Sequence, residues 1–356
     1  MNIGSLIFAV KKAAFWGVSA RAHTPKCGDL SWAWLFLFIV LPACAAPQVR
    51  EPQRYAILPS AEEITFFSPD FEILSRASLA LPPGCQIWAH HPAPLGGDWL
   101  GLQLVCKGRE AAWVYHLASG ESRLLLDESV ADSRILAWAD ANFLYLQTNM
   151  LTDPRVLLAD ARAGRFHETS LPATIYHMDT APRVVLYALT DGIGLGSQLW
   201  RPGATGPLLN LPDEIIAFAR FSPDGSQVAY IAMPDSTAVF PPGELWLLDV
   251  DSGTRRALFE ADAGRGFSPA WSPDGRWLAF VDRQRRLVLL APESGESLIV
   301  GHQILHTPAW SPDSQGVFFA IALGDTIETW YCEIVSGQIF PLPSLDGAAW
   351  FGFWQP

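Results

Sequence analysis

Residues 219–225 read ARFSPDG, residues 269–275 read PAWSPDG and residues 308–314 read PAWSPDS. An apolar run follows each of them: VAYIA, WLAFV and VFFAI, in that order. In such a turn Pro presets φ, Asp caps the turn through its side chain, and Gly takes the positive φ that closes it. The three stretches therefore predict β-hairpins. The third copy has Ser314 in place of the glycine, and we expect Gly316 to take over after a longer turn.

The same frame recurs along the chain roughly every 40 residues. The repeated anchor positions are Trp138, Met178, Phe221, Trp271, Trp310 and Trp350. A Ser-Gly or Ala-Gly turn follows the anchors, at 163–164, 252–253, 294–295 and 336–337, and an earlier degenerate copy has one at 119–120. Each unit then holds two hairpins, which is typical of a four-stranded β-propeller blade. A sandwich would not repeat at a fixed period.

The two ends of the repeat region complement each other. Residues 54–81 look like outer strands with a turn at 68–70, and residues 347–356 supply a single strand. Joining them completes one more blade and removes exposed sheet edges. We therefore predict an all-β propeller of seven four-stranded blades closed by both termini, with six blades as the alternative.

The aromatic-Ser-Pro-Asp-Gly turn before an apolar strand resembles the WD-like repeat of TolB-type propellers. Prolyl oligopeptidase-like peptidases carry similar propeller domains. The resemblance is strong over residues 213–345 and weaker over 53–356. It implies the fold and no particular activity. TolB-like propellers commonly have six blades, which keeps that count open.

Composition excludes several classes of protein. Half of the 356 residues are apolar and 17% are charged, whereas disordered and coiled-coil chains are charged and poor in aromatic residues. The formal net charge of −12 argues against nucleic-acid binding, which needs a basic surface.

The amino-terminal segment has the features of an export signal. Four bases and one acid in the first 43 residues accompany an apolar run at 31–46. That run is shorter than the ~20 residues of a transmembrane helix, so it predicts a secretory signal. The end of the run, LPAC at 41–44, resembles the lipobox of bacterial lipoproteins, from which Pro42 departs. The resemblance implies lipid attachment at Cys44.

Two alternatives to lipidation stay open: ordinary cleavage after Ala45, and an uncleaved anchor. We expect a signal segment at 1–43, a linker at 44–53 and the propeller at 54–356. The expected location is extracytoplasmic, on the membrane surface through the lipid anchor, or else secreted or periplasmic.

No catalytic constellation emerges from the sequence. A peptidase of this kind would need a Gly-x-Ser-x-Gly nucleophile elbow, and the nearest string, GFSPA at 266–270, lacks the second glycine. A Gly-x-x-x-x-Gly-Lys phosphate loop is missing as well. His90, His177 and His306 lie near expected innermost strands and are weak candidates for a metal in the channel. Some propeller lyases that act on acidic oligosaccharides hold a metal in this way. We otherwise predict no metal and no cofactor.

Two further groups of residues are assigned by position. The tryptophan anchors recur in register with the repeat, so we expect them to pack between blades rather than to bind ligands. A proline-rich stretch, Met233–Gly243, reads as an inserted loop. Within it, Phe240 and Asp235 are the candidates for contact with a partner.

The cysteines define one expected bridge. Residues 85–90 and 99–106 read as neighbouring strands of a hairpin centred near residues 95–96, which places Cys85 opposite Cys106. Opposed residues lie within disulfide range, and export exposes them to an oxidising environment. Two buried free thiols remain the alternative if export is wrong. We expect Cys332 to be unpaired and buried.

The sequence leads to two functional hypotheses. The first is a non-enzymatic, monomeric propeller outside the cytoplasm that binds a protein or an envelope component through its loop face. The second is a carbohydrate-active, lyase-like enzyme that uses a metal in the central channel.

Overall fold

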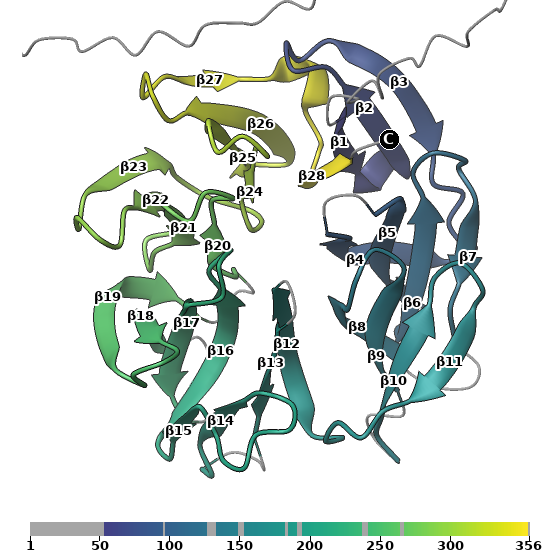
Figure 1. Cartoon of the computed structure of the whole chain (residues 1–356). Coiled ribbons are helices and arrows are strands. Elements are labelled where there is room, and N and C mark those ends of the chain that lie inside the picture. The colour runs from purple at the N-terminus through teal and green to yellow at the C-terminus, as the bar shows by residue number, and fades with distance from the viewer. Residues whose placement is uncertain are drawn as a thin grey trace, which may run out of the picture. The chain divides into compact units, whose positions relative to one another are not determined.

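The computed structural model describes residues 53–94, 97–126, 133–148, 153–181, 184–190, 194–236, 241–263 and 267–354. These residues form seven four-stranded antiparallel sheets, arranged as the blades of a propeller around a central axis (Figure 1). Two short 3-10 turns, Pro59–Ala61 and Pro343–Leu345, are the helical elements of this part of the chain. The prediction of seven blades is confirmed, and the six-bladed alternative is wrong.

We name the blades A to G and give the strands of each from the innermost outward. Blade A consists of β28 (Trp350–Trp354), β1 (Gln53–Leu58), β2 (Glu63–Phe67) and β3 (Ile73–Ser78). Blade B consists of β4 (Cys85–Pro92), β5 (Trp99–Cys106), β6 (Arg109–His116) and β7 (Ser122–Leu124). Blade C consists of β8 (Ser133–Trp138), β9 (Phe143–Thr148), β10 (Arg155–Asp160) and β11 (Arg165–Glu168). Blade D consists of β12 (Ile175–Ala181), β13 (Val184–Leu189), β14 (Ser197–Trp200) and β15 (Leu209–Leu211).

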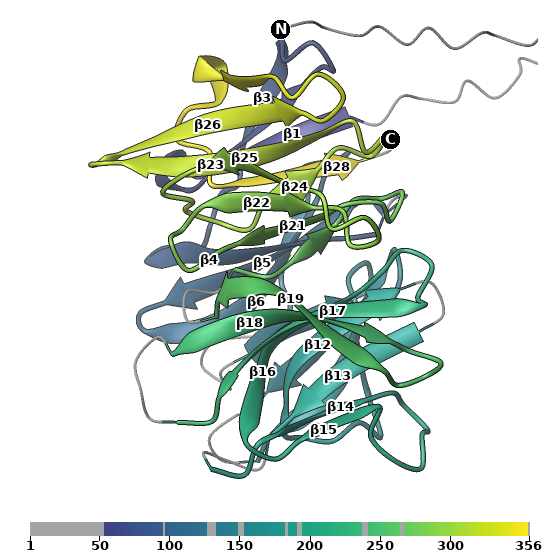
Figure 2. The same ribbon diagram turned by 90° about the vertical axis from the view of Figure 1, so that its left-hand side faces the viewer.

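The last three blades contain the repeats from which the fold was predicted. Blade E consists of β16 (Glu214–Phe221), β17 (Gln227–Pro234), β18 (Pro242–Asp249) and β19 (Arg255–Asp262). Blade F consists of β20 (Ala270–Trp271), β21 (Leu278–Val281), β22 (Leu287–Leu290) and β23 (Ser297–Gly301). Blade G consists of β24 (Ala309–Trp310), β25 (Gly316–Leu323), β26 (Thr326–Glu333) and β27 (Ile339–Pro341). In side view, blades G, F, E and D follow one another around the ring (Figure 2).

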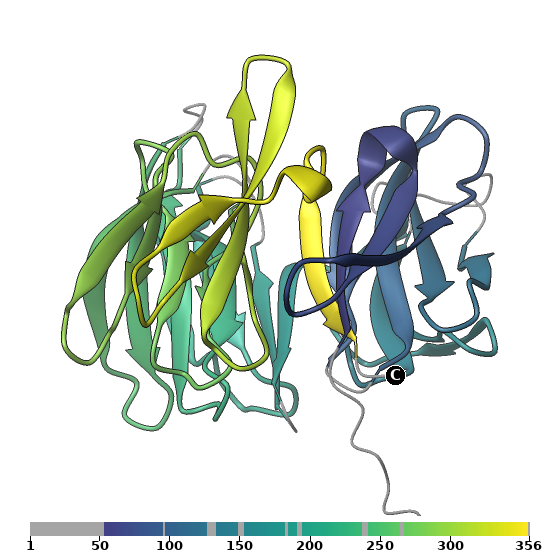
Figure 3. The same ribbon diagram turned by 90° about the horizontal axis from the view of Figure 1, so that it is seen from above.

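Blade A closes the ring with strands from both ends of the described chain. Strand β28 pairs with β1 from Gln53 opposite Trp354 to Ile57 opposite Trp350, and the two strands lie side by side in Figures 1 and 3. The turn at 68–70 joins β2 to β3 and is an outer turn of blade A, as the sequence indicates.

The core lies between blades. Each of the seven hydrophobic clusters joins residues of two neighbouring blades. Strand β17 shows the reason: Val228 and Tyr230 pack toward blade D, while Ala229 and Ile231 pack toward blade F. Since successive side chains of a strand point to opposite faces, both alternating sets are buried. A strand covered on both faces therefore reads as a continuous apolar run.

The tryptophan anchors add hydrogen bonds to this packing. The indole N–H of Trp310 donates to the carbonyl of Ala270 at 2.9 Å. Trp271 donates in the same way to Arg220 at 3.2 Å, and Trp138 to His91 at 2.8 Å. In each case the acceptor lies on the innermost strand of the preceding blade. The tryptophans thus join adjacent blades close to the axis.

The third Ser-Pro-Asp turn corrects one expectation. Ser314 itself adopts φ of +60°, and Gly316 is already the first residue of β25, so the turn is not lengthened. A Cβ at position 316 would lie 2.0 Å from the Tyr331 hydroxyl oxygen. Gly316 is therefore required by the close approach of a side chain, not by the turn.

The cysteines of blade B are joined. Cys85 lies opposite Cys106 in the pairing of β4 with β5, their Cα atoms are 4.0 Å apart, and their sulfur atoms form a disulfide. Cys332 is a free, buried cysteine on β26. Burial raises the pKa of its thiol to about 11.

Candidate functional site

The innermost strands of blades B to E share an irregularity that shapes the channel. Each has a β-bulge, which leaves one extra residue without a cross-strand partner: Trp88, Leu136, Tyr176 and Ala217. A bulge redirects the side chain of the extra residue. Trp88 is 70% exposed although the faces of its blade pack against blades A and C. Trp88 is thus an exposed residue of an innermost strand.

The three predicted histidines lie in or just before innermost strands, and each is half-buried. The His90 Nε2 atom is 3.2 Å from the Tyr55 hydroxyl oxygen. The His177 Nε2 atom is 2.8 Å from the Ala219 carbonyl oxygen on the neighbouring blade. The His306 ring packs on Trp350, with 4.8 Å between ring centroids. Each imidazole therefore bridges two blades.

Burial keeps these imidazoles neutral. Desolvation, with the nearby His91 and His306, lowers the pKa of His90 to about 3. Desolvation and the Arg220 guanidinium lower the pKa of His177 to about 4, and desolvation alone lowers that of His306 to about 4. His91 has a pKa of about 3 through desolvation and the charges of Arg220 and Arg134.

The charged residues of the same region were not among the predicted site residues. Arg220 on β16 forms a salt bridge with Asp179 on β12 at 2.7 Å and donates from Nε to the Ser268 hydroxyl. Arg134 on β8 donates to the Tyr176 carbonyl oxygen at 2.9 Å. A single charged residue in an apolar strand forms no motif. Only the position of these residues on innermost strands could have indicated them in the sequence.

The candidate histidines do not form a metal-binding set. In the described part of the chain, no three His, Cys, Asp or Glu side chains lie close enough together to share a metal ion. The Nε2 atom of His177 is hydrogen-bonded to the backbone of Ala219, and that of His90 is hydrogen-bonded to Tyr55. A metal ligand needs a free lone pair on its coordinating nitrogen. We therefore derive no metal chemistry from this channel.

We expect the chain purified under mild conditions without chelators to contain almost no bound metal. The reason is that the Nε2 atoms of His90 and His177 already have hydrogen-bond partners. Inductively coupled plasma mass spectrometry measures the stoichiometry directly. One manganese, zinc or iron per chain, lost in a His90→Gln variant, would contradict this expectation.

The loops between the second and third strands of the blades define one face of the propeller, which we call the loop face. In blade D this loop is 190–196, and in blade E it is 235–241. The predicted insertion, Met233–Gly243, is therefore longer than the loop, because β17 continues through Pro234 and β18 begins at Pro242. Phe240 lies outside the described residues.

Asp235 connects these two loops. Its carboxylate accepts a hydrogen bond from the Gly196 N–H at 2.8 Å, and the backbone N–H groups of Gly194, Gly196 and Leu195 lower its pKa. A Cβ on Gly196 would lie 2.1 Å from the Leu211 carbonyl oxygen, so the loop can pass there only with glycine. The side chain of Leu195, between Gly194 and Gly196, is 64% exposed.

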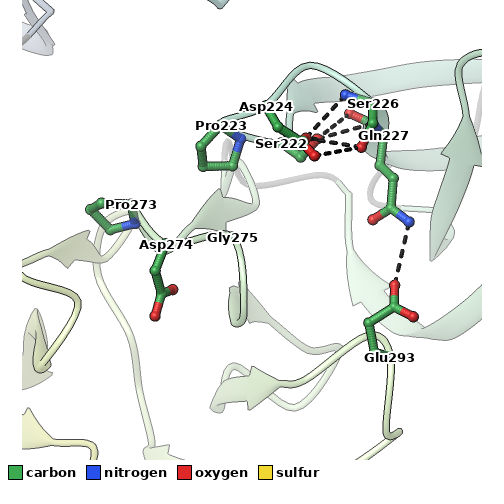
Figure 4. Close-up of a pocket in the computed structure, with 9 residues that line it drawn as sticks. All are labelled: Ser222, Pro223, Asp224, Ser226, Gln227, Pro273, Asp274, Gly275 and Glu293. Atoms are coloured by element: carbon green, nitrogen blue, oxygen red, sulfur yellow. Dashed lines mark hydrogen bonds between the residues drawn. The ribbon is translucent and has the colours of Figure 1, made fainter. Parts of the chain in front are cut away.

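The Ser-Pro-Asp turns of blades E and F lie on the opposite face, where they line a hollow of about 490 Å³ between these two blades (Figure 4). Asp224, Asp274 and Glu293 contribute carboxylates to it. Asp224 accepts from the Ser222 hydroxyl at 2.6 Å, and Asp274 accepts from Ser272 at the same distance. These carboxylates stabilise their own turns, which explains the repeated motif without a ligand.

The proposed lipid-attachment residue, Cys44, lies outside the described residues. Among the described residues, no helix is both long and apolar enough to span a membrane.

Comparisons with known proteins support the fold. No protein-family model matches the chain. It is 34% identical over 116 residues to the uncharacterized protein Atu1656 of Agrobacterium fabrum, covering 30% of this chain and 36% of that protein. It is 28% identical over 113 residues to the uncharacterized peptidase YuxL of Bacillus subtilis, covering 30% of this chain and 17% of the relative. The chain thus matches only about a sixth to a third of these relatives' lengths.

Solved structures resemble the whole propeller more broadly. An oligogalacturonate lyase in complex with manganese matches with a TM-score of 0.55 and 14% identity, over 78% of this chain and 86% of the lyase. TolB from Acinetobacter baumannii matches with a TM-score of 0.44 and 15% identity, over 79% and 60% of the two chains. The structural neighbours therefore include TolB and other propeller proteins.

Proposed function

We propose that this chain is a non-enzymatic propeller outside the cytoplasm that binds a protein or another envelope component through its loop face. In this proposal Cys44 carries the lipid that holds the protein on the membrane surface. The chain acts as a monomer and requires no cofactor.

One observation carries this proposal: Asp235 binds the backbone of residues 194–196 in the neighbouring blade, and Leu195 of that segment is exposed. An isolated exposed leucine would need no explanation. Here, however, three backbone N–H groups converge on one carboxylate, and Leu195 is in the middle of that segment. Rigidly positioned loops with exposed side chains are where propellers and other scaffolds place their recognition residues. Asp235 then acts by positioning the contact residue rather than by touching the partner.

The alternative function is a lyase-like enzyme in the channel. The observation that favours it is the group of neutral imidazoles beside Arg134 and Arg220. The hydrogen bonds of His90 and His177 count against a metal there, so we rank this function second.

Site-specific crosslinking tests the loop-face proposal. With a photoreactive amino acid in place of Leu195, we expect one adduct of defined mass in cells. An Asp235→Ala change should lower its yield at least tenfold, because residues 194–196 lose their hydrogen-bond acceptor, while the chain should still fold. The control position is Ser252, which is exposed on the opposite face of blade E.

Equal adduct yields at positions 195 and 252 would contradict the proposed role of the loop face. Activity of the purified chain on acidic oligosaccharides, lost in a His177→Gln variant, would favour the enzyme instead.

A further inference from the structure

Exposed apolar side chains are distributed unevenly around the propeller. Nine large apolar side chains are exposed in the described part of the chain, and seven of them belong to the consecutive blades F, G and A. These seven are Ile73, Leu74, Leu298, Ile299, Leu323, Val335 and Ile339. Five lie on the outermost strands β3, β23 and β27. We call this surface the apolar rim.

The outermost strands of the other blades differ in character. In blade C, β11 reads RFHE, and its Arg165, His167 and Glu168 are exposed. In blade E, β19 begins with the exposed residues Arg255 and Arg256. None of the nine exposed apolar residues lies on β7, β11, β15 or β19. The exposed large apolar residues of the outermost strands thus all belong to blades F, G and A, and Figure 3 shows the ring from the side of blades G and A.

The position at which the described chain enters the propeller bears on what can lie against this rim. The described chain enters the propeller at Gln53, the first residue of β1 in blade A. Cys44 precedes Gln53 by nine residues, which span at most about 30 Å when extended. In blade A, β3 is two strands from β1, a distance of about 10 Å. A lipid on Cys44 would therefore hold blade A, rather than blades C to E, close to the membrane.

We propose that the apolar rim of blades F, G and A lies against the lipid surface. This proposal rests on lipidation of Cys44 and is independent of the partner on the loop face. Leu74 and Ile299 insert among the lipid headgroups, and burial of their aliphatic surface supplies the attraction.

The charged residues of the rim indicate whether it would contact lipid by apolar burial or by electrostatic attraction. Arg76 on β3 is paired with Glu63 at 3.0 Å, so it offers no free charge to phosphates. Glu296 and Asp325 are exposed beside the apolar residues. Contact should therefore depend on apolar burial and change little with salt, unlike the binding of a basic patch to anionic lipids.

Fluorescent labelling tests this orientation with the full acylated chain. Leu74→Cys, Ile299→Cys and the control His167→Cys are each labelled with a polarity-sensitive dye and reconstituted into phosphatidylethanolamine–phosphatidylglycerol vesicles. The native thiols do not interfere, because Cys85 and Cys106 are bonded and Cys332 is buried. We expect brominated lipids to quench the dyes at 74 and 299 at least threefold more than the dye at 167.

A second measurement separates lipid contact from the tether itself. In the unacylated Cys44→Ala chain, Leu74→Gln together with Ile299→Gln should lower vesicle binding about tenfold, whereas His167→Gln should not change it. The loop-face crosslink at position 195 should be unaffected by the rim variants.

Three results would overturn the proposal. The first is equal quenching at positions 74 and 167. The second is a dye at position 74 that still reports an apolar environment without lipid, together with a doubled mass of the particle. That result would mean that a second copy of the chain covers the rim. The third is a mature chain without acyl groups, which would remove the tether.

Discussion

A chain that ends at Ala349 is expected to lose the folded propeller as a whole, not one blade alone. It lacks β28, and with it Phe351 and Trp354, which are 4% and 7% exposed. Loss of a buried aromatic side chain costs about 3–5 kcal/mol, and the total stability of a domain is only about 5–15 kcal/mol. The indole N–H of Trp354 also donates to the Asp98 carboxylate of blade B at 2.8 Å, so the truncation opens that interface as well.

Thermal denaturation followed by circular dichroism measures the effect. The matched control is a chain that ends at Trp354, which keeps every residue of β28 and should melt like the full chain. An Ala349-terminated chain that melts cooperatively within a few degrees of that control would show that β28 does not close the ring.

The second large effect is a loss of stability in mild acid. His90 and His91 have pKa values of about 3, and His177 and His306 of about 4, chiefly because burial disfavours the imidazolium. In the unfolded chain each regains a pKa near 6.5. Between pH 6.5 and about 4 the unfolded state therefore binds more protons than the folded state, and the free energy of unfolding falls as pH falls.

The size of this effect follows from the number of histidines. Each contributes up to about 1.4 kcal/mol per pH unit, so four give at most about 5 kcal/mol per pH unit below pH 6. Because the imidazoles are half-buried, water in the channel offsets part of this slope. Urea denaturation at pH 7, 6 and 5 measures how the free energy of unfolding changes with pH. These values lie above the range in which carboxylates are protonated.

Two variants test the assignment of the slope. His90→Gln should reduce it by about a quarter, since glutamine does not titrate and can still bond to Tyr55. The exposed residue His302→Gln should leave it unchanged. A stability that stays constant from pH 7 to 5 would contradict the desolvation of the channel histidines.

The predictable part of the structure was local in sequence. The pairing of Cys85 with Cys106 followed from the spacing within one hairpin, and the Ser-Pro-Asp turns followed from the φ preferences of their residues. Strand alternation and a fixed period then extended these units to seven blades. Each of these arguments uses residues close together along the chain.

The unpredicted part depends on neighbours in space. The Asp235 carboxylate binds backbone N–H groups 39 to 41 residues earlier in the sequence, and nothing in its own loop indicates them. In the same way, Arg220 forms its salt bridge with Asp179 of the preceding blade. Gly316 was misread because its constraint is Tyr331, which lies on another strand.

The shared blade A also sets the time at which folding can finish. Gln53 and Trp354 are paired strand residues separated by 301 positions, so β1 has no inner partner until Trp354 has been synthesised. At about 5–20 residues per second this delay is about 15–60 s. During that interval β1 has no inner neighbour and the ring stays open. The nascent chain therefore lacks the strand pairing that completes blade A. For the export proposed above, this delay would keep the ring open, and the chain competent for translocation, until β28 has been synthesised.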